Sequence, residues 1–420
     1  MRKCSEMPYH IGLKAKIYPN YKQKRVIAKN CGASRFVYNR MVGIGNEIWR
    51  LKKTAAFCPS DRQRIEYLSS VRKSAVSLQN SAPFLYDPEI DSNVVLTAMK
   101  NYRTAWKNMR EQHRGVPTFH KRKEKQSYQT SAHYAKASEM MNDGSIRILD
   151  RHRILIPKIG RIRFDASPKL IDTILSMQEG TRISTVTVLK DAVGEYWVSM
   201  ALSSEHSFRS PLEKTGACIG IDLNLSNFLA TSDGELIPNP RYLQEAGDDL
   251  NKIQYRMGKS SDRNRKAGRH LCECRNYQKL RRKYAYQNRM VCRQRNDFQH
   301  VISKRLVENQ DLIVAEDLKV RNLLKNHHLA RAISDAGWTS FLTKISQKAT
   351  MYGKTFLKVP AQYTTQTCAV CGHICTGEDY IPLGVEEWIC PSCGAKLARD
   401  PNAAVNILRK GLTSLGLATG

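Results

Sequence analysis

Two apolar runs that each end at acidic residues, ACIGIDL at residues 217–223 and DLIVAED at residues 311–317, decide the fold of the second half of this chain. The second run is a continuous apolar stretch, which is typical of a strand covered on both faces of a sheet. Between them, NFLATSDGELI at residues 227–237 contains the turn signal Asp233-Gly234 and predicts a hairpin. The sequence therefore predicts a mixed α/β sheet from residue 211 onward.

Three acidic residues stand out in these segments: Asp222 and Glu316 at strand ends, and Asp400 before the helix expected over residues 401–407. Taken alone, each is more often a turn or helix-cap residue. Asp317 competes with Glu316, but neighbouring strand residues face opposite sides, so only one can share a face with Asp222. Three carboxylates brought together repel one another until cations bind. Magnesium or manganese held by such oxygens suits hydrolysis of a phosphodiester, and the conjunction predicts a nuclease.

Four cysteines form two Cys-x2-Cys-Gly pairs separated by eighteen residues, Cys368 with Cys371 and Cys390 with Cys393. This spacing is typical of a tetrahedral zinc ribbon, and the glycines allow the tight turns that such a site needs. Four protein ligands leave no open position, so the predicted zinc is structural. His373 and Cys375 lie nearby, but their spacing fits less well.

The charge of the chain predicts a polyanionic partner. The 420 residues carry a formal net charge of +30, and nucleic acid is the partner that such an excess favours. We find no apolar run near the ~18 residues of a membrane span and no signal peptide, and the scattered remaining cysteines fit a reducing cytoplasm. A basic stretch at residues 242–309 either forms solvated helices or, as its interleaved tyrosines favour, contacts nucleic acid. Its candidate contacts are Arg265, Lys266, Arg269, Arg281, Arg282 and Lys283.

The first half of the chain combines strand and helix patterns. Residues 10–19 alternate apolar and polar side chains, which predicts a strand, and apolar residues then recur at helical spacing from residue 22 to about residue 109. Short strand-like runs return between residues 129 and 204, separated by turn signals. We therefore expect a small antiparallel barrel interrupted by a helical insert.

Several motifs together resemble TnpB, the RNA-guided DNA endonuclease family of insertion sequences that is considered ancestral to type V CRISPR effectors. They are SRFVYN at 34–39, GIDLN at 220–224, NDFQHVISKRLV at 296–307, EDLKVRNL at 316–323, DAGW at 335–338, the two cysteine pairs and RDPNAAVNIL at 399–408. Many members carry Gly where this chain has Asn224. The resemblance implies an Asp-Glu-Asp active site at Asp222, Glu316 and Asp400.

The resemblance also implies a domain order. It predicts a wedge-type β-barrel at 1–21 and 127–210, a helical recognition lobe at 22–126, an RNase H-like (RuvC) nuclease domain at 211–360 and 399–420, and a zinc ribbon inserted at 361–398. The lobe would read a short DNA motif beside the target, with Tyr38, Asn39 and Lys53 as candidate contacts.

The expected function is cleavage of DNA that is complementary to a guide RNA from a transposon end, by two-metal hydrolysis with Mg²⁺ or Mn²⁺. The partners are the guide RNA and double- and single-stranded target DNA, without a membrane, for a protein that we expect to be monomeric, cytoplasmic and associated with the prokaryotic nucleoid. A regulator that binds DNA without cutting it and a small type V CRISPR effector are the alternatives. A strand-joining transposase is disfavoured, because no Tyr or Ser motif indicates a covalent nucleophile.

Overall fold

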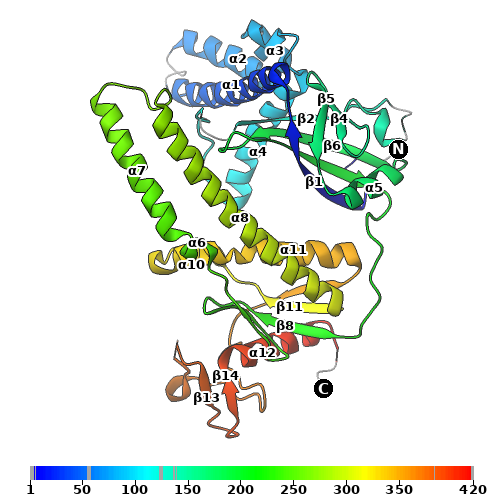
Figure 1. Cartoon of the computed structure of the whole chain (residues 1–420), viewed down its shortest axis with the longest axis vertical. Helices are drawn as coiled ribbons and strands as arrows, with labels where there is room; N and C mark the ends of the chain where they lie inside the picture. Colours follow the sequence, from blue (N-terminus) through cyan, green and yellow to red (C-terminus); the bar gives the residue numbers. More distant parts are fainter. Residues whose placement is uncertain are drawn as a thin grey trace. The chain divides into compact units, whose positions relative to one another are not determined.

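A computed structural model describes residues 4, 6–53, 58–122, 126–135, 138, 140–382 and 384–417 of the chain. It divides into two compact units, Met1–Phe208 and Arg209–Gly420, which we describe separately. Figure 1 shows both units, with labels on most of their helices and strands.

Unit 1 is built on a seven-stranded sheet in which every paired neighbour is antiparallel, in the order β2-β6-β7-β1-β5-β4-β3. Its first strand alternates as predicted, with Leu13, Ala15 and Ile17 buried in the core. No pairing among the described strands joins β2 to β3, so closure into a barrel stays a prediction. The strands are β1 (Tyr9–Tyr18), β2 (Gln126–Ser131), β3 (Arg147–Ile148), β4 (Arg153–Ile156), β5 (Gly160–Asp165), β6 (Thr181–Lys190) and β7 (Tyr196–Ser204).

Helices occupy the predicted insert between β1 and β2. The longest, α1, begins after a capping box in which the Asn20 side chain accepts from Gln23 N and the Gln23 side chain accepts from Asn20 N. Its buried face packs with α4 in the same core as the sheet. The helices of unit 1 are α1 (Tyr21–Leu51), α2 (Pro59–Lys73), α3 (Ala75–Asn80), η1 (Pro83–Tyr86), α4 (Ser92–Gln112), η2 (Met141–Asp143) and α5 (Pro168–Ser176).

Unit 2 contains the predicted mixed sheet, with strand order β10-β9-β8-β11-β12. The strands β8, β11 and β12 run parallel, whereas β9 and β10 form the antiparallel hairpin that Asp233-Gly234 predicts. Helices cover both faces, as Figure 1 shows for α11 and α12. The strands are β8 (Cys218–Asp222), β9 (Asn227–Thr231), β10 (Leu236–Pro238), β11 (Leu312–Glu316) and β12 (Thr355–Val359).

Alternation along the central strands divides the apolar side chains between the two faces. Ile219, Ile221, Ile313 and Ala315 join a core that contains Phe341 of α11, and Leu312 and Val314 pack with Ile407 of α12. Both faces of the sheet are therefore covered, as the continuous apolar run predicted. The helices of unit 2 are α6 (Tyr242–Glu245), α7 (Gly247–Lys266), α8 (Arg275–Asn309), α9 (Val320–Leu323), α10 (His327–Ala336), α11 (Trp338–Tyr352) and α12 (Arg399–Ser414).

A small cysteine-rich segment lies between β12 and α12. It contains η3 (Gly377–Asp379) and a two-stranded antiparallel sheet, β13 (Glu387–Ile389) with β14 (Lys396–Ala398). Its own core includes Cys368, Cys375, Trp388 and Cys390. Such a core is too small to fold by apolar burial alone, which is the usual condition for a structural metal site.

Candidate functional site

Asp222 and Glu316 end two adjacent parallel strands at the same level. Ile221 pairs with Ala315 in the register of β8 and β11, so the next residue on each strand is the acid. Both side chains are buried, at 6% and 8% exposure. Asp317 instead forms ion pairs with Lys319 and Lys358 and is not part of this group. Alternation left open which of Glu316 and Asp317 shares a face with Asp222, and the structure places Glu316 there, as the resemblance to TnpB implied.

Helix α12 reaches this pair because two glycines let it lie directly on the sheet. A Cβ at Gly220 of β8 would lie 2.1 Å from the Ala404 carbonyl oxygen, and a Cβ at Gly411 of α12 would lie 2.5 Å from a methyl carbon of Val314. Gly220 shares a strand face with Asp222, and Val314 shares one with Glu316. The same contact that seats α12 therefore carries its first turn towards the carboxylates.

Asp400 lies in that first turn. The helix begins at Arg399 with Ala398 as the N-cap residue, and no capping hydrogen bond from a side chain is present. The alternative role of Asp400 as an N-cap is therefore wrong, because the helix starts two residues earlier than the sequence suggested. A carboxylate in the first turn is favoured by the helix dipole. We call Asp222, Glu316 and Asp400 the carboxylate site.

Two polar side chains that were not predicted as part of the site form hydrogen bonds with Asp400 and Glu316. Asn224 Nδ2 donates to Asp400 Oδ2 at 2.8 Å, and the same side chain accepts from Asn227 N at 2.7 Å. The hydroxyl of Thr364, which is buried, donates to Glu316 Oε1. A hydrogen bond to a carboxylate fixes its orientation. The only hint in the sequence was the departure from Gly at position 224.

Burial raises the pKa of all three acids of the carboxylate site. Desolvation, followed by the charges of Glu316 and Asp400, raises the pKa of Asp222 to about 8. Desolvation also raises the pKa of Glu316 and of Asp400, opposed by the Thr364 hydrogen bond and Lys410 for Glu316 and by Arg399 for Asp400. Buried acids that destabilise each other's charged forms are the donor set that a divalent cation relieves.

The carboxylate site is less tightly gathered than the cysteine group. Among the described residues, the four cysteines are a set of potential ligands whose atoms all lie within 4.8 Å of one another, and the three carboxylates form no such set. The carboxylates are nonetheless close enough for Glu316 and Asp400 to shift the pKa of Asp222. The chemistry of the donors, two buried carboxyl groups and the half-buried one of Asp400, fits Mg²⁺ or Mn²⁺.

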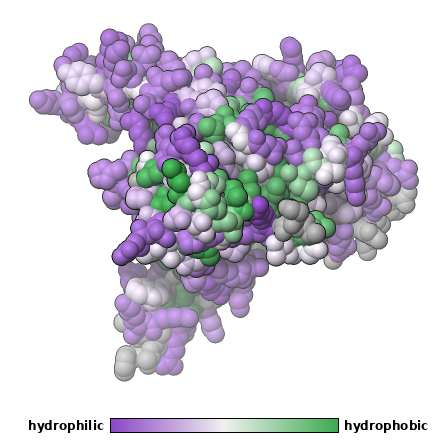
Figure 2. All heavy atoms as spheres, turned by 90° about the horizontal axis from the view of Figure 1, so that it is seen from below, coloured by the Kyte–Doolittle hydropathy of each residue, from purple (hydrophilic) through white to green (hydrophobic). Residues whose placement is uncertain are grey.

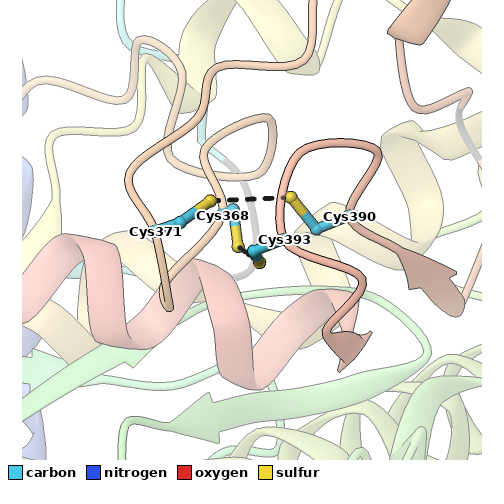
Figure 3. A group of neighbouring side chains, drawn as sticks. All are labelled: Cys368, Cys371, Cys390 and Cys393. Carbon is cyan, nitrogen blue, oxygen red and sulfur yellow. Dashed lines mark hydrogen bonds between the residues drawn. The ribbon is translucent and has the colours of Figure 1, made fainter.

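Cys368, Cys371, Cys390 and Cys393 form the predicted four-sulfur group. Figure 3 shows their side chains converging from two loops, with Cys368 Sγ 3.8 Å from Cys393 Sγ and Cys371 Sγ 3.7 Å from Cys390 Sγ. Sulfur atoms at these separations suit the corners of a tetrahedron around Zn²⁺. The nearby Cys375 is buried in the same core but lies outside the group, as its spacing predicted.

Each cysteine pair is closed by a glycine in the left-handed region. Gly372 has φ of 78° and donates its N–H to the Cys368 carbonyl, and Gly394 has φ of 71° and donates to the Cys390 carbonyl. A backbone hydrogen bond at His373 lowers the pKa of Cys371 to about 7. This hydrogen bond therefore favours the thiolate form of Cys371, which is the form that binds zinc.

Two buried asparagines of α12 join the cysteine segment to the carboxylate site. Asn402 accepts from Ala369 N at 2.7 Å and donates to the Thr367 carbonyl at 2.8 Å. Asn406 donates to the carbonyls of Thr364 and Thr367 at 2.9 and 2.6 Å. Since Thr364 holds Glu316, one helix both carries Asp400 and fixes a partner of Glu316.

The candidate contacts in unit 1 are engaged within the unit. Tyr38 is 8% exposed and stacks on His120 with ring centroids 3.9 Å apart. Asn39 donates to the His120 carbonyl at 2.8 Å and accepts from its N–H at 2.7 Å. Lys53 is exposed and lies over the ring of Trp49 at 4.0 Å. Binding of nucleic acid by these three residues stays a prediction.

The basic candidates in unit 2 lie at the facing ends of α7 and α8. Arg265, Lys266 and Arg269 are exposed near the end of α7, and Arg282 and Lys283 are exposed near the start of α8. Arg281 is half-buried and donates to Gln278 at 3.3 Å. Figure 2 shows that most of the face in view is hydrophilic.

None of the helices that the structure describes could cross a membrane, since each is too short or too polar.

Three family models match successive parts of the chain. A model described as a helix-turn-helix domain of OrfB_IS605 matches residues 7–53, one described as a probable transposase, OrfB_IS605, matches residues 199–327, and the Cas12f1-like TNB domain matches residues 338–407. These matches cover the motifs around Asp222, Glu316 and the cysteines. They confirm the resemblance to TnpB.

Curated relatives align over almost the whole chain. A protein of Streptomyces pristinaespiralis named "Putative RNA-guided DNA endonuclease" is 29% identical over 97% of this chain and 90% of its own length. InsQ of Escherichia coli, which carries the same description, is 24% identical over 95% of this chain and 91% of its own length.

A solved structure has a similar fold. The structure titled "Cryo-EM structure of the Cas12f1-sgRNA-target DNA complex" matches with a TM-score of 0.51 and 11% identity, over 95% of this chain and 98% of that chain. The likeness extends through both units, and it agrees with a mixed α/β protein that has several sheets and a four-cysteine group.

Proposed function

From the resemblance of this chain to TnpB, we propose that it is an RNA-guided DNA endonuclease that uses a guide RNA from a transposon end. The observation that carries the proposal is the carboxylate site: Asp222 and Glu316 lie level and buried on parallel strands, and α12 brings Asp400 to them. Relatives that share almost the full length are named for the same activity. The formal charge of +30 suits a protein that binds RNA and DNA together.

The three carboxylates would hold Mg²⁺ or Mn²⁺, which supplies Lewis acidity at a phosphate oxygen and lowers the pKa of water. The residues of the chain provide the arrangement. Asn224 and Thr364 orient Asp400 and Glu316 through their hydrogen bonds. Lys410, whose charge favours ionised Glu316, and Arg399, whose charge favours ionised Asp222 and Asp400, offset part of the repulsion among the acids. These two cations thus reduce the cost of ionising the acids, and a bound divalent cation would offset the remainder.

Zinc has a structural role in this proposal. The four thiolates would occupy all of its coordination positions. Asn402 and Asn406 of α12 form hydrogen bonds with the cysteine segment, and Asn406 also bonds to the Thr364 carbonyl. The proposed domains follow the family order: a wedge-type barrel at 1–21 and 127–210, a recognition lobe at 22–126, a RuvC-like nuclease domain at 211–360 and 399–420, and a zinc ribbon at 361–398. Base pairing of the guide RNA would select the target, and the protein would read only a short flanking motif.

Cleavage of matching DNA tests the proposal. The protein, purified with the RNA that accompanies it in its native locus, should cut DNA complementary to the variable end of that RNA when Mg²⁺ is added. Asp222→Asn should abolish cutting, because one lost ligand charge weakens cation binding, and it should leave RNA-guided DNA binding unchanged. The measurement is gel analysis of cut DNA beside a binding titration in chelator.

Asp317→Asn is the matched control, because this neighbouring acid pairs with lysines outside the carboxylate site and its loss should leave cleavage intact. Unchanged cutting by Asp222→Asn would contradict the assignment of the site. Intact DNA at saturating complex with Mg²⁺ would instead identify a regulator that binds without cutting.

A further inference from the structure

Unit 1 carries a pocket between α1, α2 and α4 whose chemistry differs from that of the carboxylate site. Its volume is about 660 Å³, within the range of sites for small ligands. None of the described residues that line it is Asp or Glu. The cationic lining residues are Lys52, Arg72, Lys73, Arg103 and Arg110.

Aromatic side chains lie among these cations. Trp49 lines the pocket with 66% of its surface exposed, and the ammonium of Lys53 covers its ring at 4.0 Å. Trp106 is half-buried and packs edge-on against Tyr102, with centroids 6.4 Å apart and an interplanar angle of 79°. A tryptophan this exposed contributes little to the core, whereas an exposed indole beside cations is the common platform for a nucleic-acid base.

The backbone and the floor of the pocket are fixed by specific contacts. A Cβ at Gly45 would lie 2.5 Å from the Tyr102 hydroxyl oxygen, so the glycine lets Tyr102 seat against α1. Arg103 of α4 donates to the carbonyls of Arg72 and Lys73 at 3.4 and 3.1 Å, which ties α4 to the end of α2. These contacts hold Tyr102 against α1 and join α4 to the end of α2 before any ligand binds.

We infer that this pocket binds one unpaired nucleotide, with its base stacked on Trp49 and its phosphates beside the lysines and arginines. The absence of acids among the described lining residues favours an anionic ligand, and the aromatic faces favour a flat one. The inference takes nucleic acid as the ligand class from the proposed function. RNA and DNA share the chemistry that this pocket recognises.

Strands with and without bases test the inference on the full-length protein in chelator. We expect Trp49→Ala to weaken binding of a short base-bearing strand by about tenfold, within the range measured for one stacked base, and to leave binding of an abasic strand of equal length and charge unchanged. RNA and DNA versions of both strands, followed by fluorescence anisotropy, identify the source of the nucleotide. Trp49→Phe should restore most of the affinity.

Tyr67→Ala is the control, because Tyr67 is 48% exposed, has Arg64 over its ring at 5.5 Å and does not line the pocket. Photo-crosslinking of strands that contain 5-bromouracil should join the base to the peptide of Trp49 or Trp106. Equal losses on base-bearing and abasic strands, or crosslinks confined to other peptides, would overturn the inference. Neither readout requires cleavage, so the two experiments test the pocket even if the protein does not cut DNA.

Discussion

Hydrogen-bond donors decide how the acids of the carboxylate site are oriented. Asn224 donates to Asp400, and Thr364 donates to Glu316. The Asn224 side chain also accepts from the Asn227 N–H, and the Thr364 carbonyl accepts from Asn406. A carboxylate that loses its donor in a buried site keeps the desolvation cost without the bond. Such residues orient the predicted metal ligands and are not ligands themselves, so the spacing of the acids in the sequence could not predict them.

A buried lysine, Lys354, lies just before β12 and pairs with Asp311, which lies just before β11. Asp311 accepts from Lys354, whose side chain is 1% exposed, and from the backbone of Thr215 and Gly216. The Lys354 bond, followed by the Thr215 backbone bond, holds the pKa of Asp311 well below its ordinary value. An acid with a lowered folded-state pKa stabilises the fold above its unfolded pKa and loses that contribution as pH falls.

Asp311→Asn should therefore lower the free energy of unfolding of unit 2 at pH 7 and flatten its decrease below about pH 4, the ordinary pKa of an aspartate. Urea unfolding at a series of pH values measures this dependence. Asp249→Asn, at an exposed acid 3.9 Å from Lys252, should change neither quantity. Parallel pH curves for Asp311→Asn and the unchanged chain would contradict this role.

At the scale of elements, the contact of α12 with β8 and β11 assembles the site. This helix contributes Asp400 and packs Ile407 on the face of the sheet opposite α11. It also bonds to the cysteine segment through Asn402 and Asn406. The contact depends on glycine where the two backbones meet.

Gly220→Ala tests the seat of α12. Its new methyl group would meet the backbone of Ala404, which cannot move as a side chain can, and overpacking of this kind costs about 1–3 kcal/mol. We expect a lower urea midpoint and reduced cleavage, because Asp400 moves away from Asp222. Gly12→Ala in β1, where a Cβ meets nothing within 4 Å, should leave the midpoint nearly unchanged. A normal midpoint for Gly220→Ala would show that the helix is seated elsewhere.

Loss of zinc tests the coupling between the cysteine segment and the carboxylate site. Cys390→Ser should reduce the zinc content by about one ion per chain and expose the segment to proteolysis, because its small core cannot fold alone. Elemental analysis and limited proteolysis measure both effects, and cleavage should fall as Thr364 loses its position. Cys375→Ser, at a buried thiol outside the four-sulfur group, should keep its zinc. Equal zinc in Cys390→Ser and the unchanged chain would disprove the site.

At the scale of the whole molecule, the excess of basic residues sets the response to salt. Neutralising phosphates with Lys or Arg releases counterions, so the logarithm of the binding constant falls linearly with the logarithm of salt concentration. The exposed cations on α7 and α8 can contribute to this slope. Arg151 and Arg153 in unit 1 are already paired with Asp172 and Asp150.

Replacing Arg265, Lys266 and Arg269 together with Ala should reduce that slope for single-stranded RNA by about 2, or about 0.7 for each lost contact. Filter binding at several salt concentrations measures the slope. Arg151→Ala with Arg153→Ala should leave it unchanged, because their charges are compensated locally. An identical slope in the triple variant would assign these three residues to solubility alone.

The sequence by itself determined the elements and their chemistry. Apolar runs predicted β8 and β11, the paired Cys-x2-Cys spacing predicted the four-sulfur group, and alternation along a strand showed that only one of Glu316 and Asp317 can share a face with Asp222, because these patterns depend on the local geometry of the backbone. Tertiary structure alone decided the register of Asp222 with Glu316, the seat of α12 on Gly220 and the bonds from Asn224 and Thr364. These contacts join residues far apart in the chain, and packing rather than local preference selects them.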